Sequence, residues 1–291
     1  MEPTNPWDLW NWLQQLQQGR NEGPHWPAFI KPFHLVSFAL ANRQDPTLRP
    51  AIHGKAATYA MRMRLFEAAG LEPPANLPER DPGGRFLPAL ALDADTDPGS
   101  VAGTLRRIAD VQGVDEGTVE SLETTLIEIL GNCTHHGESL DSITALTAAQ
   151  AWPRGARAQI AVADLGVGMR SSLGHNPSLD LEHWNSCELA AQYGVTSKPE
   201  GHSGYGLTLA RELMERNGGR FLLASGDELF ISDSVTTFRE AGQARWPGTL
   251  VVLEWRLDRP LNVRDVYDSW PLPEGFDHDD FDLQGFDDLL T

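Results

Sequence analysis

One long amphipathic stretch constrains this chain more than any other feature. Residues Asp115 to about Cys133 predict a helix, because apolar residues recur at the three-to-four-residue spacing of one helical face. That face consists of Leu122, Leu126, Ile129, Leu130 and Cys133. Beside it, Glu128, Asn132 and His136 recur at i, i+4 and i+8. A helix packed by its apolar face therefore directs a carboxylate, an amide oxygen and an imidazole into one cleft.

The chemistry of this polar stripe suits a site for a metal ion and a phosphate. Asn132 offers a neutral oxygen to Mg²⁺, which prefers hard oxygen ligands and keeps some of its waters. Glu128 is placed to orient or deprotonate a water molecule that attacks a γ-phosphate. The alternative is a helix face that only meets solvent, and the stripe alone does not decide between the two.

A second motif, Asp164-Leu-Gly166-Val-Gly168-Met169, follows an apolar strand predicted at 159–163. A carboxylate at a strand end can accept a hydrogen bond from the amino group of adenine, whereas guanine presents a carbonyl at that edge. The two glycines let the backbone approach a base closely. Taken alone, the motif is also typical of an ordinary strand-to-turn connection.

A third motif, Gly201-His-Ser-Gly204-Tyr205-Gly206-Leu207, opens a helix predicted to run to about Asn217, where Gly218 and Gly219 stop it. Glycines at the start of a helix expose N–H donors, and the helix dipole favours an anion there. The motif therefore predicts a phosphate-binding turn. The alternative is a plain glycine-rich loop.

In this order and at these separations, the three motifs resemble the N, G1 and G2 boxes of the GHKL superfamily, over residues 122–257. That superfamily includes histidine kinases, anti-sigma-factor serine kinases, gyrase-type topoisomerases and large heat-shock chaperones. The resemblance implies a Bergerat-type ATP-binding fold, an α/β two-layer sandwich in which helices cover a mixed sheet. The His136-Gly137 ending of the first motif is closer to the anti-sigma kinases than to gyrase.

The resemblance also implies roles for individual residues. Glu128 corresponds to the general base where ATP is hydrolysed, Asn132 to the Mg²⁺ ligand and Asp164 to the adenine-binding carboxylate. Thr249, on a late predicted strand, resembles the threonine that supports the adenine. The other residues expected at the nucleotide are His136, Gly166, Gly168, Met169, Lys198, Gly204, Tyr205, Gly206 and Leu207.

The polar stretch between Gly168 and Gly204 is the expected lid, since loops of more than about 15 residues in a compact domain are usually functional or disordered. Lys198 is the only Lys or Arg between Arg170 and Arg211. It is therefore the expected partner for phosphate charge in an otherwise acidic segment. The alternative is a loop lysine that only meets solvent.

Three parts are expected along the chain. Residues 1–114 predict a small α/β region of unknown role, residues 115–260 the ATP-binding domain and residues 261–291 an acidic C-terminal tail. The other predicted helices lie at 7–17, 56–69, 101–111 and 189–193, and the other predicted strands at 33–40, 86–92, 220–225, 229–232 and 249–257.

The charge of the chain limits its partners. The formal net charge is −18, and residues 265–291 carry nine acids without Lys or Arg, so they supply −9 of it. An acidic chain repels phosphate backbones, which argues against general nucleic-acid binding and requires local compensation wherever ATP binds. Two cysteines at no metal-ligand spacing, and no apolar run near 18 residues, predict a cytoplasmic protein without a membrane span.

Three functions fit these features. The first is Mg-dependent ATP binding with slow hydrolysis, in which a regulatory protein partner senses the state of the lid. The second is a serine/threonine protein kinase of the anti-sigma type, and the third an ATP-dependent binding module without turnover. Glu128 favours hydrolysis over the third, because binding alone does not require that carboxylate. The sequence leaves the partner and the oligomeric state open.

Overall fold

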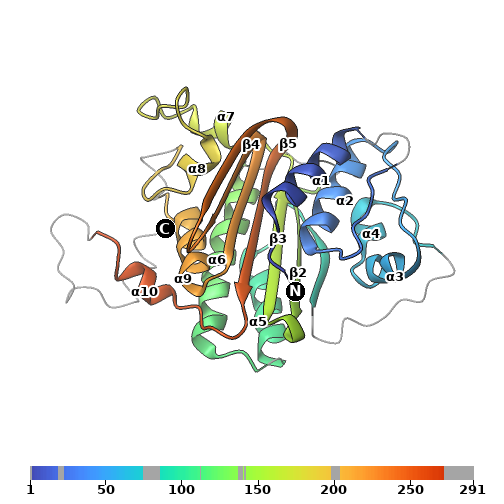
Figure 1. Ribbon diagram of the computed structural model, residues 1–291, viewed down its shortest axis with the longest axis horizontal. Coiled ribbons are helices and arrows are strands. Elements are labelled where there is room, and N and C mark those ends of the chain that lie inside the picture. The colour runs from blue at the N-terminus through green and yellow to red at the C-terminus, as the bar shows by residue number, and fades with distance from the viewer. Residues whose placement is uncertain are drawn as a thin grey trace.

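Figure 1 shows the computed structural model, in which helices cover both faces of a central sheet. The structure describes residues 2–18, 23–74, 86–111, 113–136, 140, 142–197 and 204–271. The described helices are α1 (Pro6–Gln18), α2 (Pro32–Gln44), α3 (Gly54–Arg62), α4 (Leu65–Ala69), α5 (Pro98–Val111), α6 (Glu116–His136), η1 (Pro153–Gly155), α7 (Met169–Leu173), α8 (Ser186–Ala190), α9 (Gly206–Asn217) and α10 (Val263–Tyr267). The strands are β1 (Phe86–Leu92), β2 (Ala145–Trp152), β3 (Arg157–Asp164), β4 (Arg220–Asp233) and β5 (Thr237–Arg256).

The strands form one sheet in the order β1-β2-β3-β5-β4. This confirms the α/β architecture of helices on a sheet. The expected mixed sheet is corrected, because the four neighbouring pairs that the structure describes are all antiparallel. Short connections between β2 and β3 and between β4 and β5 permit only antiparallel hairpins. The register places Ala145 opposite Asp164, at the end of the central strand β3, where the second motif begins.

Side chains alternate between two apolar faces along the central strands, as the period of two in a strand requires. One face, shared with α1 and α2, carries Leu222, Ala224, Leu250 and Val252. The other, shared with α6 and α9, carries Phe221, Leu223, Val251 and Leu253. The sheet is therefore buried on both sides, and the N-terminal helices add a third layer to the expected two.

Helix α2 corrects the strand predicted at residues 33–40. Pro32 occupies the first turn, where a missing N–H costs nothing, and the Lys31 N–H donates to His34 Nδ1 at 3.0 Å. Residues 32–40 are all buried, because α2 lies between the sheet and other N-terminal helices. A helix that is buried all round has no polar face, so its sequence lacks the helical period.

Other differences are local. Arg64, at φ 52°, breaks the helix predicted at 56–69 into α3 and α4. The strands predicted at 220–225 and 229–232 form one strand, β4, whose register shifts around Gly226. Strand β5 begins at Thr237, twelve residues before the start predicted at 249, and β2 was not predicted.

A buried polar cluster joins the N-terminal segment to the sheet. The Glu254 carboxylate is fully buried and accepts hydrogen bonds from the Thr4 N–H at 2.8 Å and from Gln159 Nε2 at 2.8 Å. The Lys31 Nζ lies 3.3 Å from Glu254 Oε1. Burial, and secondarily the charge of Lys31, lowers the pKa of His34 to about 3, so its ring is neutral.

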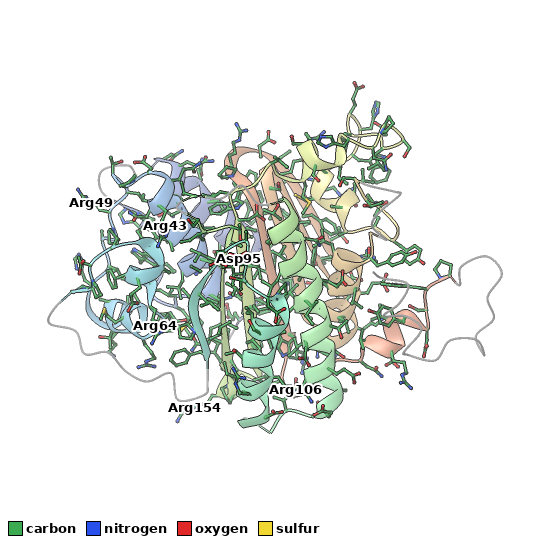
Figure 2. All side chains as sticks on the ribbon, turned by 180° about the vertical axis from the view of Figure 1, so that it is seen from behind. Arg43, Arg49, Arg64, Asp95, Arg106 and Arg154 are labelled. Atoms are coloured by element: carbon green, nitrogen blue, oxygen red, sulfur yellow. The ribbon has the colours of Figure 1, made fainter. Side chains whose placement is uncertain are left out.

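Helices α5 and α6 lie side by side on the opposite face, as the reverse view in Figure 2 shows. Arg106 of α5, labelled there, pairs with Glu116 and, at 2.9 Å, with Glu123 of α6. Residues 261–271, expected to belong to the tail, are part of the folded core, since Leu261, Val266 and Trp270 are buried. The rest of the expected tail lies outside the described residues.

Candidate functional site

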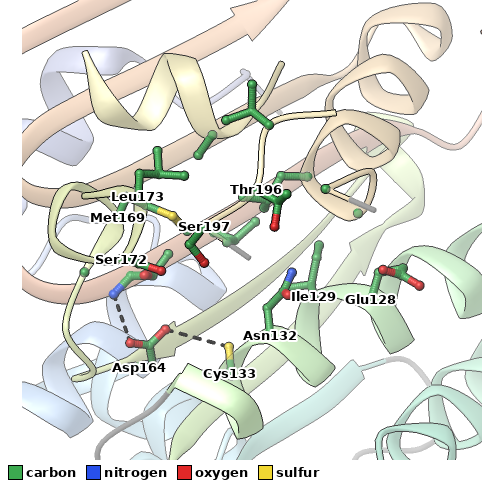
Figure 3. A pocket seen from close by; sticks show the side chains of 18 of the residues that line it. Glu128, Ile129, Asn132, Cys133, Asp164, Met169, Ser172, Leu173, Thr196 and Ser197 are labelled. Atoms are coloured by element: carbon green, nitrogen blue, oxygen red, sulfur yellow. Dashed lines mark hydrogen bonds between the residues drawn. The ribbon is translucent and has the colours of Figure 1, made fainter. Parts of the chain in front are cut away.

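A cleft that is open to solvent lies between α6, the turn after β3, and the start of α9. Figure 3 shows Asp164 and Cys133 at one end, Glu128 at the other and Asn132 between them. The lining residues are Glu128, Ile129, Asn132, Cys133, Asp164, Val167, Gly168, Met169, Ser172, Leu173, Ala190, Val195, Thr196, Ser197, Gly204, Tyr205, Gly206, Leu207, Thr249 and Val251.

Asp164 stands at the closed end of this cleft. It is 5% exposed, and its Oδ1 accepts hydrogen bonds from the backbone N–H of Gly166 at 2.8 Å and of Thr249 at 3.1 Å. Its Oδ2 lies 3.8 Å from the Cys133 thiol. Burial raises the pKa of Asp164 from 3.8 to about 6, and the backbone hydrogen bonds partly offset that effect. One carboxylate oxygen is thus fixed by the backbone.

Close backbone approach explains why glycine occurs beside Asp164. A Cβ on Gly248 would lie 2.4 Å from both the backbone oxygen and Oδ1 of Asp164. Gly168 has φ +78°, and a Cβ there would lie 2.9 Å from Ser225 Oγ. That hydroxyl accepts from the Met169 N–H at 2.8 Å and donates to the Gly248 carbonyl at 2.7 Å. The Asp164 turn is therefore packed against the β4–β5 hairpin.

The opposite end of the cleft holds Glu128 and the start of α9. Glu128 is half-buried, and burial raises the pKa of its carboxyl. A Cβ on Gly206 would lie 2.9 Å from Glu128 Oε2, so this glycine allows α9 to begin against the carboxylate. Asn132, one turn further along α6, is exposed to the cleft.

The turn before α9 requires glycine at Gly204. Its φ is +71°, and a Cβ there would lie 2.6 Å from the carbonyl oxygen of Val195. Tyr205 occupies the N-cap position of α9, and Gly218, in the left-handed conformation, stops that helix after Asn217, as predicted. The N-terminus of α9 therefore opens into the cleft beside residues 195–197.

Part of the expected lid is folded structure. Residues 169–190 contain α7 and α8, and Arg170 pairs with the buried carboxylate of Glu228 on β4. The same carboxylate accepts from the Ser186 N–H at 3.1 Å. This ion pair holds α7 and the start of α8 to the sheet, so residues 169–190 are not the long open loop that the sequence predicts.

The structure brings ten of the predicted site residues to one cleft: Glu128, Asn132, Asp164, Gly168, Met169, Gly204, Tyr205, Gly206, Leu207 and Thr249. Gly166 supports Asp164 from behind. The side chain of His136, and all of Lys198, lie outside the described residues. Sequence reasoning did not single out Cys133, Ser172 and Leu173 as site residues, although they line the cleft, because they carry no motif signal of their own.

A known protein family matches the part of the chain that forms most of this cleft. Residues 94–217 match the family model of the histidine kinase-like ATPase domain. Residues 94–217 are a histidine kinase-like ATPase domain. The matched range begins before α5, ends with α9 and contains all three motifs, so the resemblance to the GHKL superfamily is confirmed. The anti-sigma subtype is not distinguished by this match.

A histidine kinase-like ATPase domain supports ATP binding in general. Strands β1, β4 and β5 lie outside the matched range, although they complete the sheet that carries the cleft, and helices α1 to α4 also lie outside it. A comparison with curated proteins found no match. In the part of the chain that the structure describes, no helix combines the length and apolar character needed to cross a membrane.

Proposed function

We propose that this chain binds Mg·ATP in the cleft and hydrolyses it slowly, as a nucleotide-controlled switch for a protein partner. The observation that carries the proposal is the setting of Asp164, where backbone N–H groups hold Oδ1 while the side chain lines the cleft. A buried acceptor fixed in this way suits the amino group of adenine. Thr249, whose N–H fixes Asp164, is proposed to support the same base.

The phosphates are proposed to point toward Glu128, Asn132 and the start of α9. A net charge of −18 opposes ATP, so this end of the cleft must supply compensation. Backbone N–H groups at Gly206 and the dipole of α9 provide part of it. Lys198 remains the predicted source of positive charge, although it lies outside the described residues.

The residues of the cleft fit a magnesium ion held mainly by the nucleotide. Among the described residues, no three His, Cys, Asp or Glu side chains form a metal-binding group. Mg²⁺ commonly uses one or two protein oxygens together with phosphates and waters, and Asn132 offers such an oxygen. When bound, the ion neutralises phosphate charge.

Glu128 is the proposed general base. Burial raises the pKa of its carboxyl, which makes the carboxylate a stronger base near neutral pH. Its position against Gly206 places it at the phosphate end of the cleft. This favours hydrolysis over binding without turnover, while phosphorylation of a protein by the same site remains the second candidate. The free thiols of Cys133 and Cys187 are consistent with the proposed cytoplasmic location.

Incubation with ATP labelled on the γ-phosphate separates these functions. Slow hydrolysis releases labelled phosphate, a protein kinase labels a partner in a cell extract, and a binding module leaves the label on ATP. We expect Glu128→Gln to keep ATP affinity within a few-fold and to slow phosphate release about a hundredfold or more. Asn132→Ala should instead remove the magnesium dependence of binding. Wild-type hydrolysis by Glu128→Gln would show that Glu128 is not the base.

A further inference from the structure

The segment after β5 connects the two helices that bound the cleft. We call residues 261–271 the C-terminal strap. The Leu261 N–H donates to Thr118 Oγ1 and the Val263 N–H to Ser121 Oγ, both on α6 and both at 2.9 Å. At its other end, Ser269 Oγ lies 2.6 Å from an Arg216 guanidinium nitrogen on α9. The strap therefore ties together the helices that carry Glu128 and Gly206.

The strap ends in an aromatic cluster that reaches the wall of the cleft. The Trp270 ring lies 5.1 Å from Tyr193 and 5.2 Å from Tyr205, measured between ring centroids. Tyr193 and Tyr205 stack on each other at 4.7 Å, and Tyr267 packs on the edge of Trp270 at 5.1 Å. Trp270 is 7% exposed, and its Nε1 donates to Glu212 at 3.2 Å.

The position of Tyr205 gives this cluster a consequence for the nucleotide. Tyr205 lines the cleft, follows the tight Gly204 turn and caps α9. Tyr193 is only two residues from Val195, whose carbonyl faces Gly204. Both sides of the turn thus end on tyrosines that Trp270 holds together. A shift of Trp270 requires the turn to lose two ring contacts, each worth about 0.5–1.5 kcal/mol in typical proteins.

We propose that Trp270 is a positioning residue for the nucleotide cleft, which couples the C-terminal strap to the Gly204 turn. The proposal rests on the proposed ATP site and adds its regulation. Because coupling between two sites is reciprocal, a partner that displaces the strap changes ATP affinity, and ATP changes the affinity for that partner. The nine-acid segment 265–291 overlaps the strap, so a partner with a basic surface fits this role.

The test compares variants of the full chain by ATP titration in the presence of Mg²⁺. Trp270→Ala should weaken ATP about tenfold, whereas Trp270→Phe, which keeps a ring, should stay within about threefold. The matched control is Val266→Ala, because Val266 is fully buried in the strap but is not part of the aromatic cluster. It should lower thermal stability and leave ATP affinity within about threefold. Tyr193→Leu removes a different ring of the same cluster and should also weaken ATP about tenfold. It therefore tests the proposal even if Trp270→Ala does not fold.

Two affinity measurements would overturn the coupling while leaving the ATP site intact. One is wild-type ATP affinity in both Trp270→Ala and Tyr193→Leu, and the other is an equal loss in Val266→Ala. A wild-type chain that binds no ATP would instead overturn the proposed function and the coupling with it.

A spectroscopic readout separates positioning from mere packing. With 5-fluorotryptophan at all nine tryptophans, the ¹⁹F resonance missing from Trp270→Phe identifies Trp270. Saturating Mg·ATP should shift that resonance. A resonance that stays in place while ATP binds would mean that the strap only seals the core.

Discussion

At the scale of single residues, Asp164 combines near-complete burial with neutral hydrogen-bond donors. Backbone N–H groups of Gly166 and Thr249 hold Oδ1 but carry no full charge, so burial dominates and the pKa rises to about 6. A rigid acceptor is thereby prepared for a ligand before the ligand arrives. As a consequence, the carboxyl of Asp164 titrates close to physiological pH.

This titration gives a pH dependence with a defined sign. Between pH 3.8 and about 6 the folded protein holds more protons at Asp164 than the unfolded chain, so its contribution to the unfolding free energy falls as pH rises through that window. ATP affinity should rise over the same window, because the carboxylate is the better acceptor. Asp164→Asn should weaken ATP by about 1.5–3 kcal/mol and flatten this pH profile. Titration calorimetry of both proteins from pH 5 to 8 measures the loss of ATP affinity and its pH profile. Unchanged affinity in Asp164→Asn would mean that adenine binds elsewhere.

Gly248 offers a second prediction at this scale. Gly248→Ala puts a Cβ against the Asp164 backbone, which cannot move aside as a side chain can, and should cost about 1–3 kcal/mol of unfolding free energy as well as ATP affinity. Gly131→Ala is the control, since a Cβ there would meet no described heavy atom within 4 Å outside its own helix. It should be neutral or stabilise α6 by up to about 1 kcal/mol. Urea denaturation distinguishes the two, and equal stability of both variants would contradict the packing argument.

At the scale of elements, local signals explain what the sequence could predict. Helix α9 was predicted from Gly206 to Asn217, as observed, because glycines mark both of its ends. Strand β1 was predicted at its observed bounds, since Pro/Gly-rich residues precede its apolar run. Helix α2 was not, because burial all round removes the helical period. Strand β2 was missed because four of its eight residues are alanine, a weak strand former.

The candidate site divides in the same way. The motif residues could be found because each type of side chain has a chemical role at a fixed spacing. Cys133 and Leu173 line the cleft as ordinary apolar residues of α6 and α7, so nothing in the sequence separates them from the core. The contact of Glu254 with Thr4 joins residues 250 positions apart, and no local pattern encodes it.

The contact between α2 and the sheet depends on the buried pair of Lys31 and Glu254. Lys31→Met should cost about 3 kcal/mol of unfolding free energy, because it leaves a fully buried carboxylate without its cation. The double variant with Glu254→Gln should be less destabilised than the sum of the two single variants, with a coupling of about 1–3 kcal/mol. Urea denaturation at pH 7 of all four proteins measures this. Additive effects would mean that the pair does not act as a unit.

At the scale of the whole molecule, the chain after Pro260 consists of the C-terminal strap, which is packed in the core, and residues 272–291, which lie outside the described residues. A chain ending at Pro271 should keep its melting temperature and bind ATP as the full chain does. A chain ending at Pro260 loses the buried Leu261, Val263, Val266 and Trp270. Each typically contributes about 1.5–3 kcal/mol, which together approach the whole stability of a domain, so we expect no cooperative thermal transition. Thermal unfolding followed by circular dichroism tests the stability of both truncated chains, and ATP titration tests binding by the chain that ends at Pro271.

The chain ending at Pro271 also tests whether the removed residues bind a protein partner. Apolar residues alternate with acids after Phe276, and such a segment is proposed to dock on a partner with a basic rim. We expect the chain ending at Pro271 to lose at least one cellular partner in a pull-down with a non-hydrolysable ATP analogue. Recovery of every partner at full yield would remove the docking proposal. A lowered melting temperature would instead make the last residues part of the core.

The bond between Thr4 and Glu254 has a consequence for how the protein is made. Helix α1 packs both on α2 and on β5, so α2 covers part of its apolar face early, whereas the rest has no surface to cover until β5 has left the ribosome. At about 5–20 residues per second, these 250 residues take roughly 10–50 s to synthesise. Throughout that interval the part of α1 that packs on β5 lacks its partner, and molecular chaperones bind exposed apolar segments of this kind.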